Sequence, residues 1–219
     1  MATRLPLFPL TSVLVPGLVL PLHVFEPRYR LLVQALLALP DEAERQFGVV
    51  AIRSGREVGA DGARALHAVG CTAELREVTP YADGRFDLVT VGERRFRLLG
   101  LDEGAGTPYA TGFVDFLPER DGEGDVRELT ARVTARFAEY RERLGVDVTE
   151  LPGQPQVVSY LVAAAVVLDL PDRQGLLEQP TTADRLRVEL ELLRREVALV
   201  GAFRSLPAVE LARETGSAN

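Results

Sequence analysis

The residue types that most often carry out chemistry are few in this chain and widely separated. The two histidines, His23 and His67, and the one cysteine, Cys71, form none of the short spacings that bind zinc. We expect both histidines to be structural and Cys71 to be a small core residue, because buried cysteine behaves as a hydrophobic side chain. The sequence predicts no catalytic residue, no metal site and no cofactor.

Lysine is absent from the chain, and all 25 basic residues are arginine. A Walker A phosphate loop, a Ser-Lys catalytic dyad and a Schiff base each need a lysine, so all three are excluded. No nucleophile with a neighbouring base can be nominated either. An enzyme with an unrecognised site is therefore the least favoured class of function.

The basic cluster Arg94-Arg95-Phe96-Arg97 lies on a predicted strand. Strand alternation places Arg95 and Arg97 on the same face. They would contact phosphates in an RNA-binding protein, or pair with Asp87 and other acids across the sheet. We favour ion pairing, because the net charge is −7 and neither half of the chain is basic. Nucleic acid is thus not the expected partner.

A strand-to-helix corner at residues 25–30 is the sharpest candidate for a binding surface. Phe25 and Tyr29 lie beside Glu26 and Arg28, and aromatic and arginine side chains are the usual anchors of protein interfaces. The alternative is purely structural: Glu26 stabilises the helix N-terminus, Tyr29 belongs to the core, and Arg28 pairs with an acid. The sequence leaves both interpretations open.

The pair Asp83-Gly84 between two strand-like runs predicts a two-residue hairpin turn of the primed type. Tyr81 and Phe86 flank this turn. They form a second candidate binding surface, with two aromatic side chains near an exposed tip.

Prolines 6, 9, 16, 21 and 27 divide the N-terminal apolar stretch into short extended pieces. Val15-Pro16-Gly17-Leu18 predicts a turn, and Leu18–Phe25 predicts a strand that is covered on both faces because both are mostly apolar. Pro27 then begins a helix to residue 39. Its apolar spacing predicts that four residues are buried: Leu32, Ala35, Leu36 and Leu39.

Alternating residues predict further strands at 47–53, at 66–79 with a bulge at Gly70, at 85–91, at 94–101 after a turn at Gly92-Glu93, and at 109–117. About six short strands with turns between them are typical of a small, partly closed β-barrel.

The apolar period changes from 2 to 3.6 after Pro118. A helix is predicted from Val126 to Leu144, ended by Gly145. The run 157–168 is apolar almost all round, which predicts the buried centre of a helical bundle. A short helix at 172–178 and a last helix capped by Thr181 or Thr182 follow. We expect a β-barrel subdomain at 1–117, a helical subdomain at 118–206 and a flexible tail at 207–219.

No apolar run is long enough to span a membrane, and no signal peptide is evident. One cysteine cannot form an internal disulfide, so a cytoplasmic protein is expected.

The opening residues LPLFPL, then Pro-Gly, then LPLHVFEPRYRLL closely resemble the start of the Lon N-terminal domain family. The run Gly70-Cys71-Thr72-Ala73-Glu74-Leu75 is similar to a later strand of the family, with Cys71 as a departure. The resemblance covers about residues 5–204. It implies an α+β fold: a PUA-like pseudobarrel with one helix, then an α-helical bundle.

The resemblance also implies the substrate-recognition function of that family, without its ATPase and protease domains. We therefore expect a non-enzymatic module that binds unfolded or flexible polypeptide, alone or with a separate protease or chaperone, on apolar surface between the barrel and the helical half. The alternative is RNA or nucleotide binding through the barrel. The sequence does not determine the oligomeric state. The expected contributors to polypeptide binding are Phe25, Glu26, Arg28, Tyr29, Tyr81 and Phe86.

Overall fold

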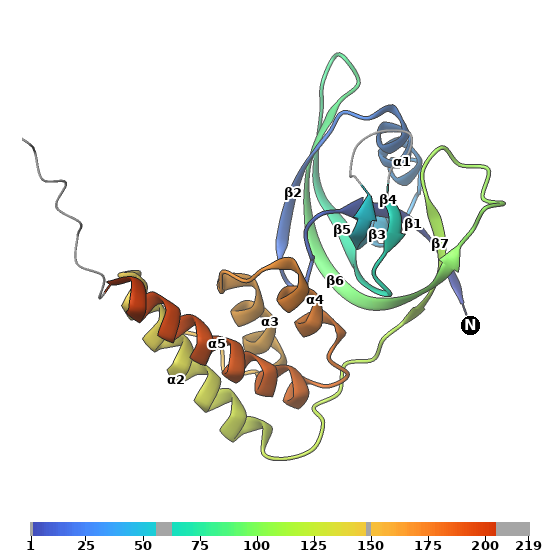
Figure 1. Cartoon of the computed structure of the whole chain (residues 1–219). Helices are drawn as coiled ribbons and strands as arrows, with labels where there is room; N and C mark the ends of the chain where they lie inside the picture. Colours follow the sequence, from blue (N-terminus) through green and yellow to red (C-terminus); the bar gives the residue numbers. More distant parts are fainter. Residues whose placement is uncertain (1, 56–62, 148–149, 205–219) are drawn as a thin grey trace, which may run out of the picture.

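The computed structural model describes residues 2–55, 63–147 and 150–204. Within these ranges the chain is an α+β protein, with seven strands in its N-terminal half and four α-helices in its C-terminal half (Figure 1). A fifth α-helix lies among the first strands. The predicted boundary at residues 117 and 118 falls between the last strand and the helices, whereas the predicted tail at 207–219 lies outside the described residues.

The strands close into a barrel. Their order is β1 (Thr3–Leu10), β7 (Thr111–Phe116), β6 (Phe86–Leu101), β5 (Val69–Pro80) and β3 (Gln46–Gly55), with β4 (Ala63–Leu66) beyond β3. A parallel pairing of β1 with β3 closes the circle, from Leu7 opposite Gly48 to Leu10 opposite Ala51. The barrel is therefore closed, where the sequence predicted partial closure. Closure leaves fewer unpaired backbone groups at sheet edges.

Strand β2 (Val19–Val24) pairs antiparallel with β6, from Val19 opposite Val91 to Val24 opposite Phe86. The prediction that this strand is covered on both faces was wrong. Val19 is 55% exposed and Phe25, just past the strand, is 49% exposed, whereas Val24 is buried. The apolar outward residues thus form surface rather than core.

Helix α1 (Pro27–Leu37) begins at Pro27, as predicted. Its buried residues are Tyr29, Leu32, Val33 and Leu36. Ala35, predicted to be buried, is exposed. The buried stripe is therefore shifted toward Tyr29 and Val33. A short 3-10 turn, η1 (Glu42–Glu44), follows the helix.

Strand β6 runs without a break through Gly92-Glu93, where the sequence predicted a turn. The glycine at position 92 is instead required because the segment Val15–Leu18 packs closely against the backbone of β6 there. Its N–H donates to Leu18 and its carbonyl accepts from Gly17, while a Cβ atom there would lie 2.2 Å from the Val15 carbonyl oxygen. The predicted turn at Val15–Leu18 exists, with Gly17 at φ +80°, and it packs against this point of the strand.

The predicted long strand at 66–79 is two strands, β4 and β5, which join at His67-Ala68. The predicted bulge at Gly70 is also displaced. The register shifts between β5 and β6 instead occur after Cys71 and after Leu75.

The hairpin between β5 and β6 has a three-residue loop rather than the predicted two-residue primed turn. Tyr81 N–H donates to the Arg85 carbonyl, and Gly84 N–H donates to the Tyr81 carbonyl, each at 2.9 Å. Gly84 has φ +80°, but no other type of residue in the described ranges has a positive φ, so Asp83 does not. A type I turn followed by a left-handed glycine fits these contacts.

The helical half contains α2 (Val126–Leu144), α3 (Pro155–Ala165), α4 (Leu170–Glu178) and α5 (Thr182–Arg204). Gly145 ends α2 in the left-handed conformation, as predicted. Thr181, one of the two predicted caps, caps α5 by accepting a hydrogen bond from the Asp184 N–H. The run 157–168 is not buried all round, since Leu161 is 40% exposed and Val167 is 74% exposed. The bundle core is shared by α2, α3 and α5.

The two halves meet in a packed junction. A buried apolar cluster joins the barrel to α3 and α4 through Val13, Val15, Ala51, Val69, Tyr160 and Leu177. Gln174 of α4 also donates to the Val69 carbonyl at 3.0 Å. Among the described residues, no helix is both long and apolar enough to cross a membrane.

Candidate functional site

The sequence hypothesis placed polypeptide binding on apolar surface between the barrel and the helical half, and the described residues at the centre of that junction are packed together. Arg95 lies there and is 1% exposed. Its guanidinium donates to Glu119 at 2.6 Å and to the carbonyls of Leu177 and Gln179 at 2.9 and 2.5 Å. Arg95 thus forms the favoured ion pair with an acid, but the acid is Glu119 and not Asp87. Arg95 and Arg97 do not form an exposed basic pair, since only Arg97 is exposed.

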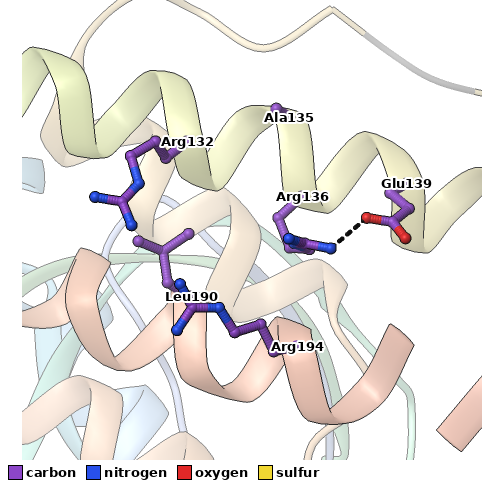
Figure 2. Close-up of a pocket in the computed structure, with 6 residues that line it drawn as sticks. All are labelled: Arg132, Ala135, Arg136, Glu139, Leu190 and Arg194. Carbon is purple, nitrogen blue, oxygen red and sulfur yellow. Dashed lines mark hydrogen bonds and ion pairs between the residues drawn. The ribbon is translucent and has the colours of Figure 1, made fainter. Parts of the chain in front are cut away.

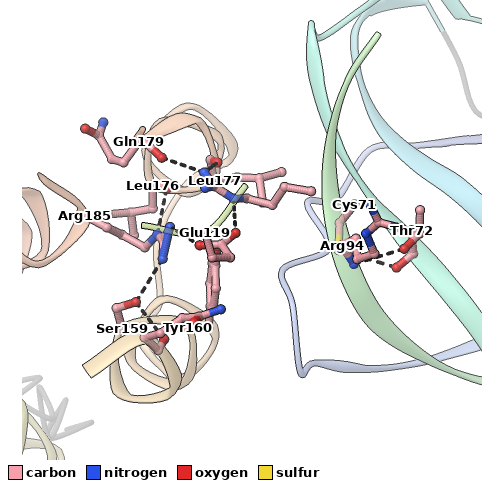
Figure 3. A network of polar contacts seen from close by, with 12 residues as sticks. Cys71, Thr72, Arg94, Glu119, Ser159, Tyr160, Leu176, Leu177, Gln179 and Arg185 are labelled. Carbon is pink, nitrogen blue, oxygen red and sulfur yellow. Dashed lines mark hydrogen bonds and ion pairs between the residues drawn. The ribbon is translucent and has the colours of Figure 1, made fainter. Parts of the chain in front are cut away.

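Glu119 is the shared acceptor of this junction (Figure 3). It accepts from Tyr160 Oη at 2.8 Å and from Arg185 at 3.4 Å as well as from Arg95. The Arg185 guanidinium stacks 3.9 Å from the Tyr160 ring centre. Burial raises the pKa of the Tyr160 hydroxyl and lowers that of Arg185. These groups hold the two halves together and present no reactive group to solvent.

The strand-to-helix corner, in contrast, borders an open cavity of about 180 Å³. The corner forms because Pro27 fits the first helical turn, where its missing N–H costs nothing. The Glu26 carbonyl accepts from the N–H groups of Tyr29 and Arg30 at 3.1 and 3.0 Å. The cavity is lined by Phe8, Leu10, Leu22, His23, Val24, Phe25, Glu26 and Tyr29.

The cavity has an apolar floor and an exposed aromatic rim. Phe8, Val24 and Tyr29 are buried, and the rings of Phe8 and Tyr29 stack with their centres 4.0 Å apart. Phe25 forms part of the rim and is 49% exposed. An apolar cavity with exposed rings around it suits an apolar ligand group.

The predicted residues Phe25, Glu26 and Tyr29 therefore come together around one cavity. Arg28 forms an ion pair with Glu26 at 3.1 Å, and its guanidinium lies 4.5 Å from the Tyr29 ring centre. Phe86 is 7% exposed and belongs to the barrel core. Tyr29 and Phe86 thus do not act as exposed aromatics, although Tyr29 contributes to the floor.

His23 links the cavity rim to the predicted hairpin candidate, Tyr81. Its ring centre lies 6.3 Å from that of Phe25 and 6.1 Å from that of Tyr81. Nδ1 of His23 lies 2.6 Å from Asp87, and Nε2 lies 3.3 Å from Arg85. The rings of Phe25, His23 and Tyr81 form a continuous surface that we call the aromatic row.

Asp87 fixes the hairpin end of the aromatic row. The Tyr81 hydroxyl donates to its carboxylate at 2.5 Å. This bond, together with the contact to His23, lowers the pKa of Asp87, and the same bond raises the pKa of Tyr81. The exposed Tyr81 ring is thereby held in one position.

Sequence reasoning missed His23 as a surface residue and missed the floor residues Phe8 and Leu10. The available signal was alternation: Phe8 and Leu10 share one face of β1, and His23 shares a face of β2 with Val19. Nothing local to either strand indicated that β1 and β2 border the same cavity.

A second cavity, of about 300 Å³, lies between α2 and α5 (Figure 2). Three arginines line it with Glu139 and Leu190: Arg132, Arg136 and Arg194. Arg136 pairs with Glu139 at 2.5 Å. Its charged lining does not suit an apolar segment, and it lies on the helices, not on the barrel where RNA binding was considered.

Comparison with known proteins gives one consistent result. Residues 4–195 match the family model described as the ATP-dependent protease La (LON) substrate-binding domain. Lon protease 2 of Syntrophobacter fumaroxidans is 28% identical over 193 residues, which cover 82% of this chain and 23% of that protein. Lon protease of Anaeromyxobacter dehalogenans is 30% identical over 203 residues, which cover 88% of this chain and 23% of that protein. This chain spans about a quarter of the length of these relatives.

Two solved structures share the fold. A Lon N-terminal domain protein from Xanthomonas campestris superposes with a TM-score of 0.63 at 29% identity, covering 88% of this chain and 98% of that chain. The N-terminal domain of a Mycobacterium avium complex Lon protease superposes with a TM-score of 0.66 over the same shares, and at 20% identity it supports the fold alone.

Proposed function

Because the chain belongs to the family of ATP-dependent protease La (Lon) substrate-binding domains, we propose that it recognises unfolded or flexible polypeptide segments without catalysing a reaction on them. The observation that supports this most is the cavity of about 180 Å³ with its buried apolar floor, together with the aromatic row, which begins on the cavity rim at Phe25 and His23 and extends to Tyr81. In this proposal Phe25 and Tyr81 contact the polypeptide directly. Glu26, Arg28 and Tyr29 shape the corner, and Phe86 supports the barrel wall from inside.

The chemistry of the rim favours loosely structured polypeptide. Aromatic rings bury a large area at little cost in side-chain entropy, and the cavity takes one apolar side chain without requiring a particular neighbour. Ordering a flexible ligand consumes much of the interaction energy, so the dissociation constant is expected to be on the order of micromolar. Apolar contacts also make the affinity tolerant of salt.

The absence of catalysis is part of the same proposal. The sequence contains no lysine, which removes both the Walker A loop and the Ser-Lys dyad of a Lon-type motor and protease. The matched family model describes a substrate-binding domain. We propose that a separate protease or chaperone acts on the bound polypeptide and that the protein works in the cytoplasm, which the buried, unpaired Cys71 supports.

The test is a titration with a reduced, unfolded model protein and, in parallel, with single-stranded RNA, each at low and high salt. Phe25→Ser should weaken binding of the unfolded protein severalfold. Leu99→Ser is the matched control, because Leu99 is 51% exposed on the barrel and does not line the cavity. Its affinity should match that of the wild type.

Binding of RNA at low salt with a steep loss at high salt, without binding of the unfolded protein, would replace this proposal with RNA recognition. An Arg194→Ala variant then distinguishes the arginine-lined cavity from the barrel as the RNA site. The absence of both kinds of binding would leave a specific folded partner as the explanation.

A further inference from the structure

Strand β2 lies at an edge of the sheet, and its pairing with β6 determines which of its backbone groups point toward β6 and which point away. Within the described ranges, β6 is the one strand that pairs with it. The N–H of Gly92 donates to the Leu18 carbonyl at 2.9 Å, which makes Leu18 and Gly92 a hydrogen-bonded pair. Because such pairs alternate along an antiparallel ladder, Leu20, Leu22 and Val24 direct their backbone groups toward β6.

The intervening residues Val19, Pro21 and His23 therefore direct their backbone groups away from β6. Pro21 is consistent with this phase, since it has no N–H to donate to β6. The outer edge of β2 presents the N–H and carbonyl groups of Val19 and His23 and the carbonyl group of Pro21. An unpaired strand edge of this kind is a template for another strand.

The cavity described above lies along this same edge. Leu22 and Val24 point to one face of β2, and His23 and Phe25 point to the other, yet all four residues line it. Neighbouring residues from both faces of a strand border one cavity where that cavity lies at the edge or at the end of the strand. Phe25 and Glu26 follow β2, so this cavity lies where the outer edge meets the end of the strand. A chain that pairs with His23 would thus place its side chains directly over the cavity.

We propose that a bound polypeptide adds to the outer edge of β2 as an extended strand and inserts one large apolar side chain into the cavity. This inference rests on the function proposed above and specifies how the polypeptide is held. A cavity of about 150 Å³ holds one benzene molecule. The cavity of about 180 Å³ therefore suits one side chain of the size of leucine or phenylalanine.

The occupant is a foreign polypeptide, not the β2 strand of a second copy. In the antiparallel register that places Val19 of one β2 strand opposite His23 of another, Pro21 lies opposite Pro21, and neither residue could donate a hydrogen bond there. A proline-free segment can still donate to the Pro21 carbonyl. Proline in an edge strand is a common device against self-pairing.

The first experiment compares N-methylated versions of a short, proline-free peptide that alternates large apolar and polar residues. One version carries N-methyl groups on alternate residues, and its matched control carries them on the remaining ones. In a strand that adds to an edge, only one of these two sets of N–H groups faces β2. One version should therefore lose at least about tenfold in affinity, and the other should bind like the parent peptide.

The second experiment removes one outward N–H from the protein. His23→Pro eliminates the N–H of residue 23, which does not point to β6, whereas His23→Ala removes the side chain and keeps that N–H. The proline variant should bind the parent peptide more weakly than the alanine variant. Hydrogen exchange on the wild-type protein provides a readout that does not depend on the folding of a variant, because the amides of Val19 and His23 should become protected when the peptide is added.

Three results would overturn strand addition. If the peptide binds but both methylated versions bind equally and the two amides stay unprotected, the proposed function survives and strand addition is wrong. If neither the peptide nor the unfolded protein binds, the proposed function fails as well. If the amide of His23 is protected without peptide and the molecular mass doubles with concentration, the edge belongs to a second copy.

Discussion

The carboxylate of Glu119 balances two arginines that are almost completely buried. Arg95 is 1% exposed and Arg185 is fully buried, and each donates to Glu119. Two guanidinium groups that are buried from water require a negative charge close to them. Glu119, which lies outside any helix or strand, is therefore the side chain that compensates the buried positive charges of Arg95 and Arg185.

Glu119→Gln should destabilise the protein by about 3 kcal/mol, because it leaves two buried positive charges without an anion. Urea denaturation measures the loss. Glu103→Gln is the control, since it removes the same charge from an exposed loop residue and should leave the midpoint unchanged. Equal midpoints for the two variants would show that the junction does not depend on the Glu119 charge.

Glu189 presents the opposite situation, an acid buried without a hydrogen-bond donor. It is 2% exposed, and neither carboxylate oxygen has a hydrogen-bond partner among the described residues. Burial raises the pKa of Glu189 well above its ordinary value of 4.5, and the nearby Arg185 only partly opposes this. The folded protein therefore binds the Glu189 proton more tightly than the unfolded chain does.

The stability that this proton provides is fully present below about pH 4.5, the pKa in the unfolded chain, and is lost as pH rises through the elevated pKa in the fold. Glu189→Gln, which mimics the protonated acid, should therefore be more stable than the wild type at about pH 8. The difference should shrink toward acid pH. Denaturation of both proteins across this range checks the sign, and a constant difference at every pH would contradict it.

Gly84 determines the conformation of the β5–β6 hairpin loop. Gly84 has φ +80°, and the Arg30 guanidinium of α1 lies over it, within 1.9 Å of where a Cβ atom would be. The hairpin tip is therefore in contact with α1 as well as with its own strands. Tyr81 and Asp87, at the base of the same loop, depend on this geometry for their place beside His23.

Gly84→Val should cost about 1 kcal/mol or more, because a β-branched residue resists positive φ. Chemical denaturation measures the effect. Gly100→Val is the matched control: Gly100 lies in β6, has no positive φ and has open space around its Cβ position. The control should be neutral or slightly stabilising. A Gly84 variant as stable as the control would mean that the loop changes its turn type at no cost.

At the scale of the whole molecule, the barrel and the helical bundle share a core. Leu177 of α4 is 1% exposed and packs in the cluster that also contains Val15 and Val69 of the barrel half. Backbone bonds from Thr182 and Ala183 to Arg120 and Asp121 attach the start of α5 to the connecting segment. Shared burial of this kind couples the unfolding of the two halves.

Leu177→Ala should lower the free energy of unfolding by about 2–5 kcal/mol through the cavity that it leaves in the junction. Because the junction is shared, hydrogen exchange in β6 and in α5 should shift by the same amount. Exposed Leu161→Ala in α3 is the control, with an expected change of less than about 0.5 kcal/mol. Separate transitions for barrel and helices would show that the halves fold independently.

The sequence by itself determined the features that depend on local chemistry. The change in apolar period separated a strand-rich half from a helical half. Pro27 gave the start of α1, and Gly145 gave the end of α2. The absence of lysine excluded three kinds of catalytic or phosphate-binding site. Each of these inferences uses residues that are close together in the chain, so no knowledge of distant contacts is needed.

Only the tertiary structure decided which of the candidate residues face solvent and which groups meet. His23 and Asp87 are 64 positions apart and become neighbours because β2 pairs with β6 in one register. Arg95 and Arg97 share a face of β6, but only Arg95 lies at a point where Glu119 and Leu177 of the helical half cover it. The sequence around Gly92 predicts a turn, but the glycine is required because the backbone at Val15 packs directly against this point of β6. In every case the burial of a side chain depends on strand register and on the packing of distant segments, which local sequence patterns do not specify.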